Sequence, residues 1–318
     1  MKKIALFVAF FGKATLLTWA QDANLTQFYA SPLYLNPALT GATPYFRLSA
    51  LYRNQWPQLP YAYHVNQFSA DYNWDYYDSG VGILLLQDRI GSMAASDTRF
   101  SASYAYRARL HKNVVLRLGL QAGIGLRNTD WQRFVFEDQL KSGGATAESF
   151  AYPTILYPDL AVGALLHRAD FWIGIAAFHL TRPSVGILHH AERLSRRFAI
   201  QAGYRIDLDP TEEEKITLSP ALLYQRQANF EQVDLGVNLY YQPLLLGIWY
   251  RGMSLQHSAV AGVVGFRLKN ALAISYSYDL ALSQLHRLGG AHEMVLLYQP
   301  LDKRRKRGSK HVPCPVAF

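Results

Sequence analysis

The stretch NVVLRLGLQAGIGLRN, residues 113–128, decides the fold. From Val114 to Leu126 every even-numbered residue is apolar, whereas the residues between them include Arg117, Gln121 and several glycines. A period of two is typical of a β-strand that has one apolar and one polar face. The run outlasts the five or six residues usual in soluble β-sandwiches, and it is long enough to cross a bilayer at a tilt.

The same alternation recurs along most of the chain, and tyrosines gather near the ends of the runs, as the aromatic girdle of a membrane barrel requires. A secreted soluble β-protein would also alternate, but in shorter strands. We therefore predict an all-β fold, a transmembrane antiparallel β-barrel at residues 45–300. Its expected strands, about 14 in number, are 45–53, 63–74, 80–87, 97–109, 114–127, 156–166, 171–180, 196–207, 215–225, 231–241, 244–251, 258–268, 271–279 and 291–299.

The connections between the expected strands alternate in length. Those at 110–113, 167–170, 242–243 and 269–270 are short and fall on one side, whereas the long connections 128–155 and 181–195 fall on the other. Bacterial outer-membrane barrels have short periplasmic turns and longer outer loops. This parity predicts that both ends of the barrel domain face the periplasm.

Two segments precede the first strand. Residues 1–20 have a basic start, an apolar run and Ala20 at the end, which predicts a secretory signal peptide; the alternative is a short membrane anchor. Residues 21–44 contain SPLYLNPALTG, which is too apolar for a solvated linker and too rich in proline for a strand. We expect this segment to form a plug or hatch in the barrel, through Pro32, Leu33, Leu35, Asn36, Pro37 and Gly41.

The net charge of +9 belongs to the ends of the chain. Three lysines precede residue 21 and the segment from Asp302 adds a net five, which leaves +1 for residues 21–301. A nearly neutral body argues against nucleic-acid binding. Residues 301–318 form a basic tail, either a disordered segment attracted to lipid phosphates or a docking peptide for an acidic periplasmic partner. The expected partner-binding residues are Lys303, Arg304, Arg305, Lys306, Arg307, Cys314 and Phe318, and the single cysteine could pair between chains.

The sequence shows no enzyme or cofactor motif. It has no HExxH, no CxxC pair and no phosphate-binding glycine loop. His189 and His190 fall in an expected outer loop, where we interpret them as a solvated pair in preference to a metal site. The inward faces carry both signs of charge, which favours ion pairs that fill the lumen over a selective pore or substrate path. The expected lumen residues are Arg107, Arg117, Gln121, Arg127, Arg205, Asp207 and Asp234.

Several motifs together resemble the PorP/SprF family, outer-membrane proteins of the type IX secretion and gliding system. They are QFYASPLYLNPALTG (27–41), LSALYRNQWPQLP (48–60), LLLQDRIGSM (84–93), LGLQAGIGLRNTDW (118–131), ISYSYDL (274–280) and HEMVLLY (292–298). The motif residues singled out are Arg53, Asn54, Gln55, Trp56, Asp88, Gly91, His292 and Glu293. The short, proline-containing stretch after RNQW and the loop 181–195 depart from the family pattern and leave the cargo open.

The resemblance implies a protein embedded in outer-membrane lipid that has no enzymatic activity and no cofactor. Family members assist the export or surface attachment of cargo that bears a C-terminal sorting domain, and they associate with the periplasmic ring and its adaptor proteins. The NPA triplet at 36–38 also occurs in the hatch of FadL-like transporters. A channel for hydrophobic solutes is therefore the alternative, and a lipid-modifying barrel enzyme would need a nucleophile and base that the sequence does not display.

Overall fold

The computed structural model describes residues 21–90, 95–130, 137–144, 154–186, 192–208, 216–253, 258–268, 271–283, 287–300 and Cys314. The predicted signal peptide therefore lies outside the described residues, as do Gly91, the histidine pair 189–190 and the tail apart from Cys314. Among the described residues, no helix combines the length and the apolar character needed to span a membrane.

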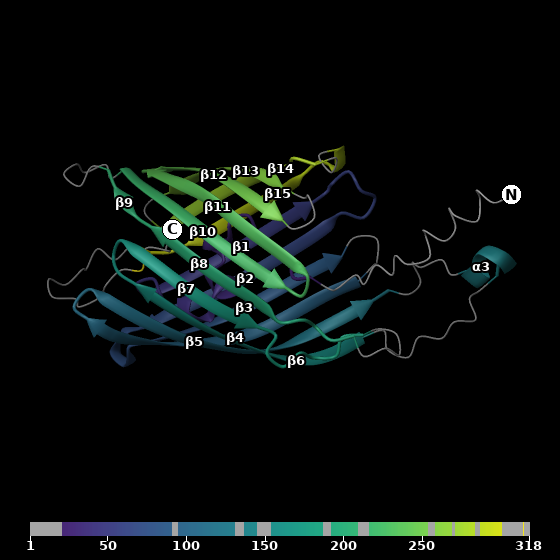
Figure 1. Ribbon diagram of the computed structural model, residues 1–318, viewed down its shortest axis with the longest axis horizontal. Helices are drawn as coiled ribbons and strands as arrows, with labels where there is room; N and C mark the ends of the chain where they lie inside the picture. The colour runs from purple at the N-terminus through teal and green to yellow at the C-terminus, as the bar shows by residue number, and fades with distance from the viewer. Residues whose placement is uncertain are drawn as a thin grey trace, which may run out of the picture.

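The described residues form one closed antiparallel β-barrel (Figure 1). Each strand pairs with its neighbours in the chain, and the last strand pairs with the first. β8 and β9 both pair with β10 and are two pieces of one strand, so the wall has 14 strands, as predicted. The strands are β1 (Phe46–Gln55), β2 (Tyr63–Trp74), β3 (Ser79–Ile90), β4 (Ala95–His111), β5 (Val114–Thr129), β6 (Thr154–His167), β7 (Phe171–Phe178), β8 (Arg197–Tyr204), β9 (Ile206–Asp207), β10 (Ile216–Gln227), β11 (Phe230–Tyr241), β12 (Leu244–Met253), β13 (Ala259–Leu268), β14 (Leu272–Ala281) and β15 (Ala291–Tyr298).

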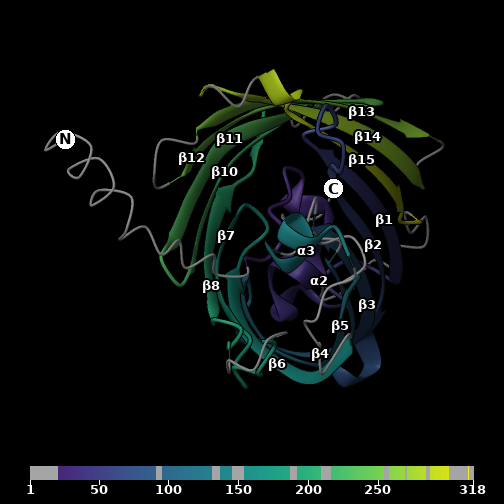
Figure 2. The same cartoon turned by 90° about the vertical axis from the view of Figure 1, so that its right-hand side faces the viewer.

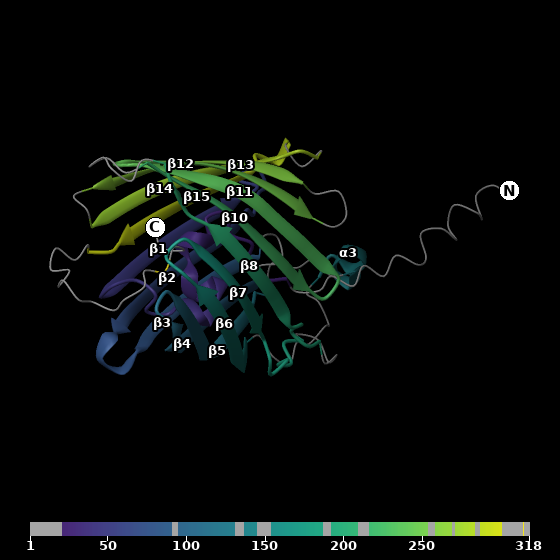
Figure 3. The ribbon, with the colours of Figure 1, turned by 60° about the vertical axis from the view of Figure 1, so that its left-hand side comes forward.

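The alternation in sequence becomes an inside and an outside in the barrel. On β5, Arg117 and Gln121 point inward and are buried, whereas Leu118 and Leu120 point outward and are exposed. The strands run obliquely to the long axis of the barrel (Figure 3), the tilt that a closed barrel requires. The outer face therefore presents an apolar surface of the kind that lipid covers.

The two ends of the barrel differ in their connections. At the end where β1 begins and β15 ends, residues 112–113 and 242–243 make two-residue turns; we call this the short-turn end. At the opposite end, the long-loop end, residues 130–153 join β5 to β6 and residues 179–196 join β7 to β8. The first of these loops contains the short helix α3 (Glu137–Ser142), which lies beyond the strands in Figure 1.

The strand expected at 196–207 is interrupted at Arg205. The register that pairs Gly203 with Ala221 and Ile206 with Leu218 places Tyr204 opposite Pro220 on β10, which has no N–H to donate to the ladder. The backbone N–H of Arg205 donates on the other side, to the carbonyl oxygen of Asp170 at 2.6 Å. The chain re-forms a two-residue pairing with β10 as β9. This break shortens β8 at the short-turn end.

The chain before β1 lies inside the barrel (Figure 2). It contains three short helices, η1 (Phe28–Ala30), α2 (Pro32–Leu35) and η2 (Pro37–Leu39). Proline at the first position suits a helix because the missing N–H would have no partner there. Asn36 is the N-cap of η2, and its side chain accepts a hydrogen bond from the N–H of Ala38 at 2.9 Å. We call residues 21–43 the N-terminal segment.

The N-terminal segment crosses the lumen from the long-loop end to the short-turn end. The N–H of Asp22 donates to the side chain of Gln227, the last residue of β10, at 2.8 Å. Gly41, with a φ of +63°, lies against Gly80 near the start of β3. Leu25, Phe28, Leu33 and Leu39 in the segment share one hydrophobic cluster with wall residues such as Trp249. This cluster is the core of the protein.

Candidate functional site in the barrel interior

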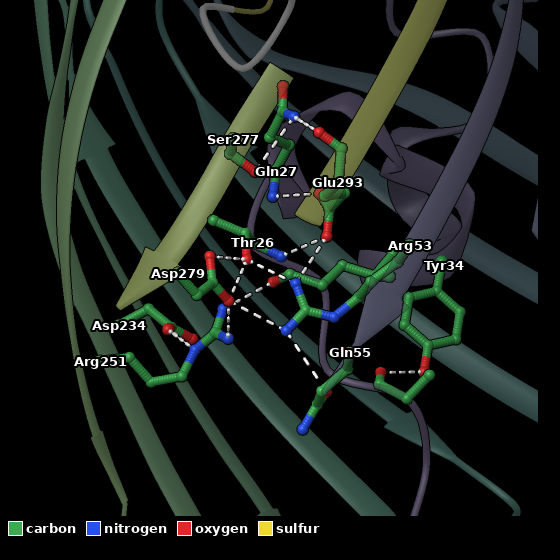
Figure 4. A network of polar contacts seen from close by, with 12 residues as sticks. Thr26, Gln27, Tyr34, Arg53, Gln55, Asp234, Arg251, Ser277, Asp279 and Glu293 are labelled. Atoms are coloured by element: carbon green, nitrogen blue, oxygen red, sulfur yellow. Dashed lines mark hydrogen bonds and ion pairs between the residues drawn. The ribbon is translucent and has the colours of Figure 1, made fainter. Parts of the chain in front are cut away.

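The strongest polar network lies at the seam where the barrel closes (Figure 4). Arg53 on β1 and Glu293 on β15 are directly opposite each other in the strand register, and their side chains form an ion pair of 3.0 Å. Arg53 also pairs with Asp279 on β14 at 2.9 Å. All three side chains are at most 6% exposed. The first and the last strands of the barrel are thus joined by buried charges as well as by backbone pairing.

The seam network holds the N-terminal segment. The carboxylate of Glu293 accepts hydrogen bonds from the backbone N–H groups of Thr26 and Gln27, at 2.9 and 2.7 Å. The hydroxyl of Thr26 donates to Asp279 at 2.7 Å, and Arg251 donates to the carbonyl oxygen of Leu25 at 3.0 Å. Buried charges need partners on most of their polar atoms, and here the segment supplies some of them.

The same network continues along the wall. Arg251 on β12 pairs with Asp279 at 3.0 Å and with Asp234 on β11 at 2.7 Å. Strands β11, β12, β14 and β15 and the seam strand β1 therefore share one set of charges around the N-terminal segment. Figure 4 shows these side chains converging from different strands on Thr26 and Gln27.

A second cluster surrounds Asp22 near the long-loop end. Its carboxylate pairs with Arg99 at 3.0 Å, with Arg197 at 3.2 Å and with His179 at 2.8 Å. The other ring nitrogen of His179 contacts Asp159 at 2.9 Å. These contacts fix the start of the N-terminal segment to β4, to β8 and to the loop after β7, and Asp159 on β6 holds His179 in that loop.

The charges of this cluster control the titration of its members. Burial alone would raise the pKa of Asp22, but Arg99, His179 and Arg197 outweigh it and hold that pKa well below its ordinary value. Burial alone would lower the pKa of His179, but Asp22 and the hydrogen bonds to Asp159 and Asp22 outweigh it and raise that pKa. Both shifts favour the imidazolium–carboxylate pair over its neutral form.

Further along, the segment is held through backbone groups. The side-chain amide of Asn36 donates to the carbonyl oxygens of Ala164 and Ile175, each at 3.1 Å. Arg117 donates to the carbonyl oxygens of Ala38 and Thr40, the first at 2.9 Å. Wall glycines leave room for this approach, because a Cβ added at Gly119 would collide with the backbone at Ala38. The wall is thus shaped to the segment.

The residues expected to form a plug are all in this interior segment. Pro32, Leu33, Leu35, Asn36, Pro37 and Gly41 are buried. Among the expected lumen residues, Arg107, Arg117, Gln121, Arg127 and Asp234 are inward and less than 10% exposed. Arg107 pairs with Asp75 and Asp78 in the β2–β3 turn, and Arg127 pairs with Asp97 at 2.7 Å.

Two of the expected lumen residues lie at the rim of the barrel. Arg205 and Asp207 pair with each other at 3.0 Å at the short-turn rim, where their side chains are 38% and 40% exposed. The alternation places them on the inward face, and Asp207 accepts a hydrogen bond from the hydroxyl of Thr217, a buried residue of β10, at 2.8 Å. Both residues are therefore inward-facing at the mouth of the barrel and are not among its buried residues.

The family-motif residues divide between the two faces of the wall. Arg53 and Glu293 point inward, as does Asp88, which is 8% exposed. Asn54 and His292 are directly opposite each other on the outward face, and His292 contacts the hydroxyl of Tyr276 at 2.7 Å. The sequence-distant motifs therefore meet at the seam. Gln55 accepts from Arg53 at 3.4 Å, and Trp56 follows it with a φ of +58° at the end of β1.

Cys314 differs from the expectation for an exposed docking residue. It is 5% exposed and belongs to the same hydrophobic cluster as the N-terminal segment. A thiol buried in this cluster is not available to a partner or to a second chain, so an intermolecular disulfide is not expected in the folded protein. The burial of this one residue could not be read from its sequence neighbours.

Sequence reasoning missed several members of the interior networks. They include Asp22, Thr26, Gln27, Arg47, Asp71, Asp97, Arg99, Tyr157, His179, Arg197, Arg251 and Asp279. Most of the missed residues that lie on strands occupy inward positions, so the alternation of apolar and polar residues in the sequence could have identified them. Within the described part of the chain, no group of three or more His, Cys, Asp or Glu side chains could hold a metal ion.

The family model for the type IX secretion system membrane protein PorP/SprF matches residues 18–298. The chain belongs to the PorP/SprF family. With its closed barrel, this family member is an outer-membrane protein of the type IX secretion system. No curated protein matches the sequence.

Among solved structures, this PorP/SprF protein is similar to known outer-membrane proteins at low identity. The Ralstonia pickettii toluene transporter TbuX has a TM-score of 0.49 and 10% identity, over 85% of this chain and 92% of that one. The Acinetobacter baumannii outer membrane protein Omp33 has a TM-score of 0.47 and 8% identity, over 82% and 100%. A Rhodopseudomonas blastica porin has a TM-score of 0.35 and 8% identity, over 80% and 97%.

Proposed function

We propose that this protein anchors cargo bearing a C-terminal sorting domain in the type IX secretion and gliding machinery, and that it contacts the periplasmic ring and its adaptors. It acts by binding and not as an enzyme. The observation that carries this proposal is the filled lumen of a PorP/SprF barrel. A barrel whose interior is occupied by its own chain offers its two ends and its outer wall to partners.

The N-terminal segment is proposed to be a structural plug. It is held by ion pairs and hydrogen bonds at the long-loop end, at the seam and near the short-turn end. Two pockets against the segment have volumes of only about 80 and 20 Å³. Ligand pockets usually measure about 300–1,000 Å³, so the described interior leaves no room for a cargo polypeptide. Cargo is therefore expected to bind outside the lumen.

The short-turn end is proposed to face the periplasm and the long-loop end the outside. The two longest connections, 130–153 and 179–196, are both at the long-loop end and support this orientation. β15 ends at the short-turn end, so the basic tail that follows it would leave on the periplasmic side. Loops 130–153 and 179–196 would then receive the sorting domain.

The test is a mild-detergent pull-down of the tagged protein, with identification of what accompanies it. Replacing residues 302–313 by a Gly-Ser linker of equal length should reduce co-purification of the periplasmic ring proteins and leave the cargo in place, while Cys314 can keep its buried position. Replacing residues 131–153 by a short Gly-Ser linker should have the opposite effect. As a control, the linker would replace residues 254–257, a short connection at the same end. Equal recovery of both partner classes from all variants, with normal surface display, would contradict the proposal.

A FadL-like channel for hydrophobic solutes is the second candidate. The NPA triplet at 36–38 favours it, because these residues lie within the lumen where a hatch would have to move. Tethering the segment across the lumen, with cysteines at Leu33 and Gly82 in a Cys314→Ser background, should then abolish solute uptake. These positions are in contact, since a Cβ at Gly82 would meet the side chain of Leu33. Unchanged uptake after oxidation would reject the channel.

A further inference from the structure

A groove of about 630 Å³ lies on the outer wall of the barrel, across the seam. Ala50 on β1 lies directly between Leu296 on β15 and Phe68 on β2, and Leu85 on β3 follows Phe68 in the same row. The three larger side chains are exposed on the outward face. The small side chain of Ala50 therefore leaves a trough between bulky neighbours, at a level where lipid covers the barrel.

The groove changes from apolar to polar toward the long-loop end. In the next row of outward residues, Asn66 and Gln87 line the groove, and the amide of Asn66 donates to Gln87 at 3.4 Å. In the row beyond, His64 lies opposite Arg89 on β3. Outward polar groups on adjacent strands are unusual at hydrocarbon depth and are expected at the headgroup level.

Arg89 is the charge that stands out in this row. Its side chain is exposed, and it has no ion pair among the described residues, whereas Arg226, an outward arginine on β10, pairs with Glu231 at 3.5 Å. The arginines of the interior described above are paired with carboxylates or backbone carbonyls. A guanidinium on the lipid-facing wall is stabilised by a phosphate, with which it can form two parallel hydrogen bonds.

The spacing between charge and trough fits a lipid. Leu85 and Arg89 are four residues apart on one strand, about 13 Å at the usual rise. The headgroup layer of each leaflet is roughly 5–8 Å deep, so a guanidinium in that layer places Leu85 and Ala50 within the hydrocarbon. Along the membrane normal, the apolar trough therefore lies at the depth of an acyl chain, and Arg89 lies at the depth of its phosphate.

We propose that this wall binds one phosphate-bearing lipid, with an acyl chain in the groove over Ala50 and its phosphate on Arg89. Asn66 and Gln87 face the polar junction between them. The binding site does not depend on the cargo role or on which end faces the periplasm, since both leaflets contain phosphate-bearing lipids. A lipid is favoured over a protein partner because the groove lies on an apolar outer wall, and Arg89, one row beyond the polar end of the groove, has no ion pair among the described residues.

The test is native mass spectrometry of the full-length protein in detergent, titrated with dioleoylphosphatidylglycerol or with the zwitterionic dioleoylphosphatidylcholine. Arg89→Gln should weaken the first phosphatidylglycerol site at least about fivefold, which corresponds to roughly 1 kcal/mol for one cation at a membrane surface. Arg89→Lys should retain most of the binding. Ala50→Phe should fill the trough and remove the site for both lipids. Arg226→Gln is the matched outward control and should bind like the wild type.

Three results would overturn the proposal. One is equal lipid retention by the wild type, Arg89→Gln and Ala50→Phe. Another is an equal loss in Arg226→Gln, which would indicate unspecific annular lipid. The third is a protein partner that binds the wild type and not Ala50→Phe, while the number of lipids bound to the two proteins is the same. Heat-dependent mobility in gels, measured for every variant, separates loss of binding from loss of folding.

Discussion

Replacing Arg53 by methionine tests whether the seam charges hold the barrel and its N-terminal segment together. Arg53 forms ion pairs of 3.0 Å with Glu293 and 2.9 Å with Asp279, and it donates to the hydroxyl of Thr26 at 2.7 Å. The variant keeps much of the side-chain volume but removes the cation. We expect a less stable barrel and faster hydrogen exchange at the N–H groups of Thr26 and Gln27.

The size of the stability loss in Arg53→Met depends on which hydrogen-bond and ion-pair partners each carboxylate retains. Asp279 keeps Arg251 at 3.0 Å and the hydroxyl of Thr26, so its loss is partial. Glu293 is fully buried and keeps two backbone donors but no ion pair among the described residues. Removing one partner of a buried ion pair usually costs about 3–5 kcal/mol. Because of the retained partners, we expect a decrease of about 3 kcal/mol in the free energy of unfolding.

The assay is urea unfolding of the protein in lipid vesicles, with hydrogen exchange measured on the folded state. Arg226→Met is the control, since Arg226 and Glu231 are 58% and 46% exposed and such surface pairs contribute less than about 1 kcal/mol. A double-mutant cycle with Glu293→Gln should give a coupling energy of about 1–3 kcal/mol. A decrease below about 1 kcal/mol, with unchanged exchange at residues 26 and 27, would refute the reasoning.

Three further outcomes are expected. The stabilisation of Asp22 by His179 should be complete below about pH 6.5 and should decline as the pH rises through the raised folded-state pKa of His179. Hydrogen exchange of the backbone amides near Asp22 should therefore become faster over that pH range. His179→Gln should remove this pH dependence. Gly163→Ala should lower the free energy of unfolding by about 1–3 kcal/mol, because its Cβ would collide with the N-terminal segment, whereas Gly262→Ala, which faces open space, should change it little; equal effects would contradict the proposed close fit. Cys314 should react slowly with a maleimide in the folded barrel and rapidly after unfolding, and rapid labelling of the folded protein would show that it is exposed.

The architecture was largely predictable because it depends on a local signal. Alternation along the chain marks each strand, and in an up-and-down barrel each strand pairs with the next, so order along the chain is also order in space. Runs such as 114–127 therefore predicted β5 to within a few residues. The break beside Arg205 was not predicted, because Pro220 marks a weak point in β10, but which residue of the neighbouring strand faces it depends on the register between the two strands.

The interior contacts depend on residues far apart in the chain. Thr26 and Glu293 are 267 positions apart, and alternation says only that Glu293 points inward. Which inward charge meets which part of the N-terminal segment depends on the path of residues 21–43 through the lumen, and no periodic pattern describes that path. Gly119 and Gly163 on the wall make room for the N-terminal segment, but from the sequence such glycines indicate only that space is needed inside a barrel.

The position of the N-terminal segment has a consequence for the order of assembly. Residue 22 lies near the long-loop end, whereas β1 begins at the short-turn end, so the segment crosses the whole lumen before the wall starts. The wall closes only when β1 meets β15, and the residues at that junction are the ones that bind Thr26 and Gln27. If the segment is laid in before closure, sealing the barrel and trapping its contents become one event, and a late folding intermediate would carry both an open seam and an unprotected N-terminal segment.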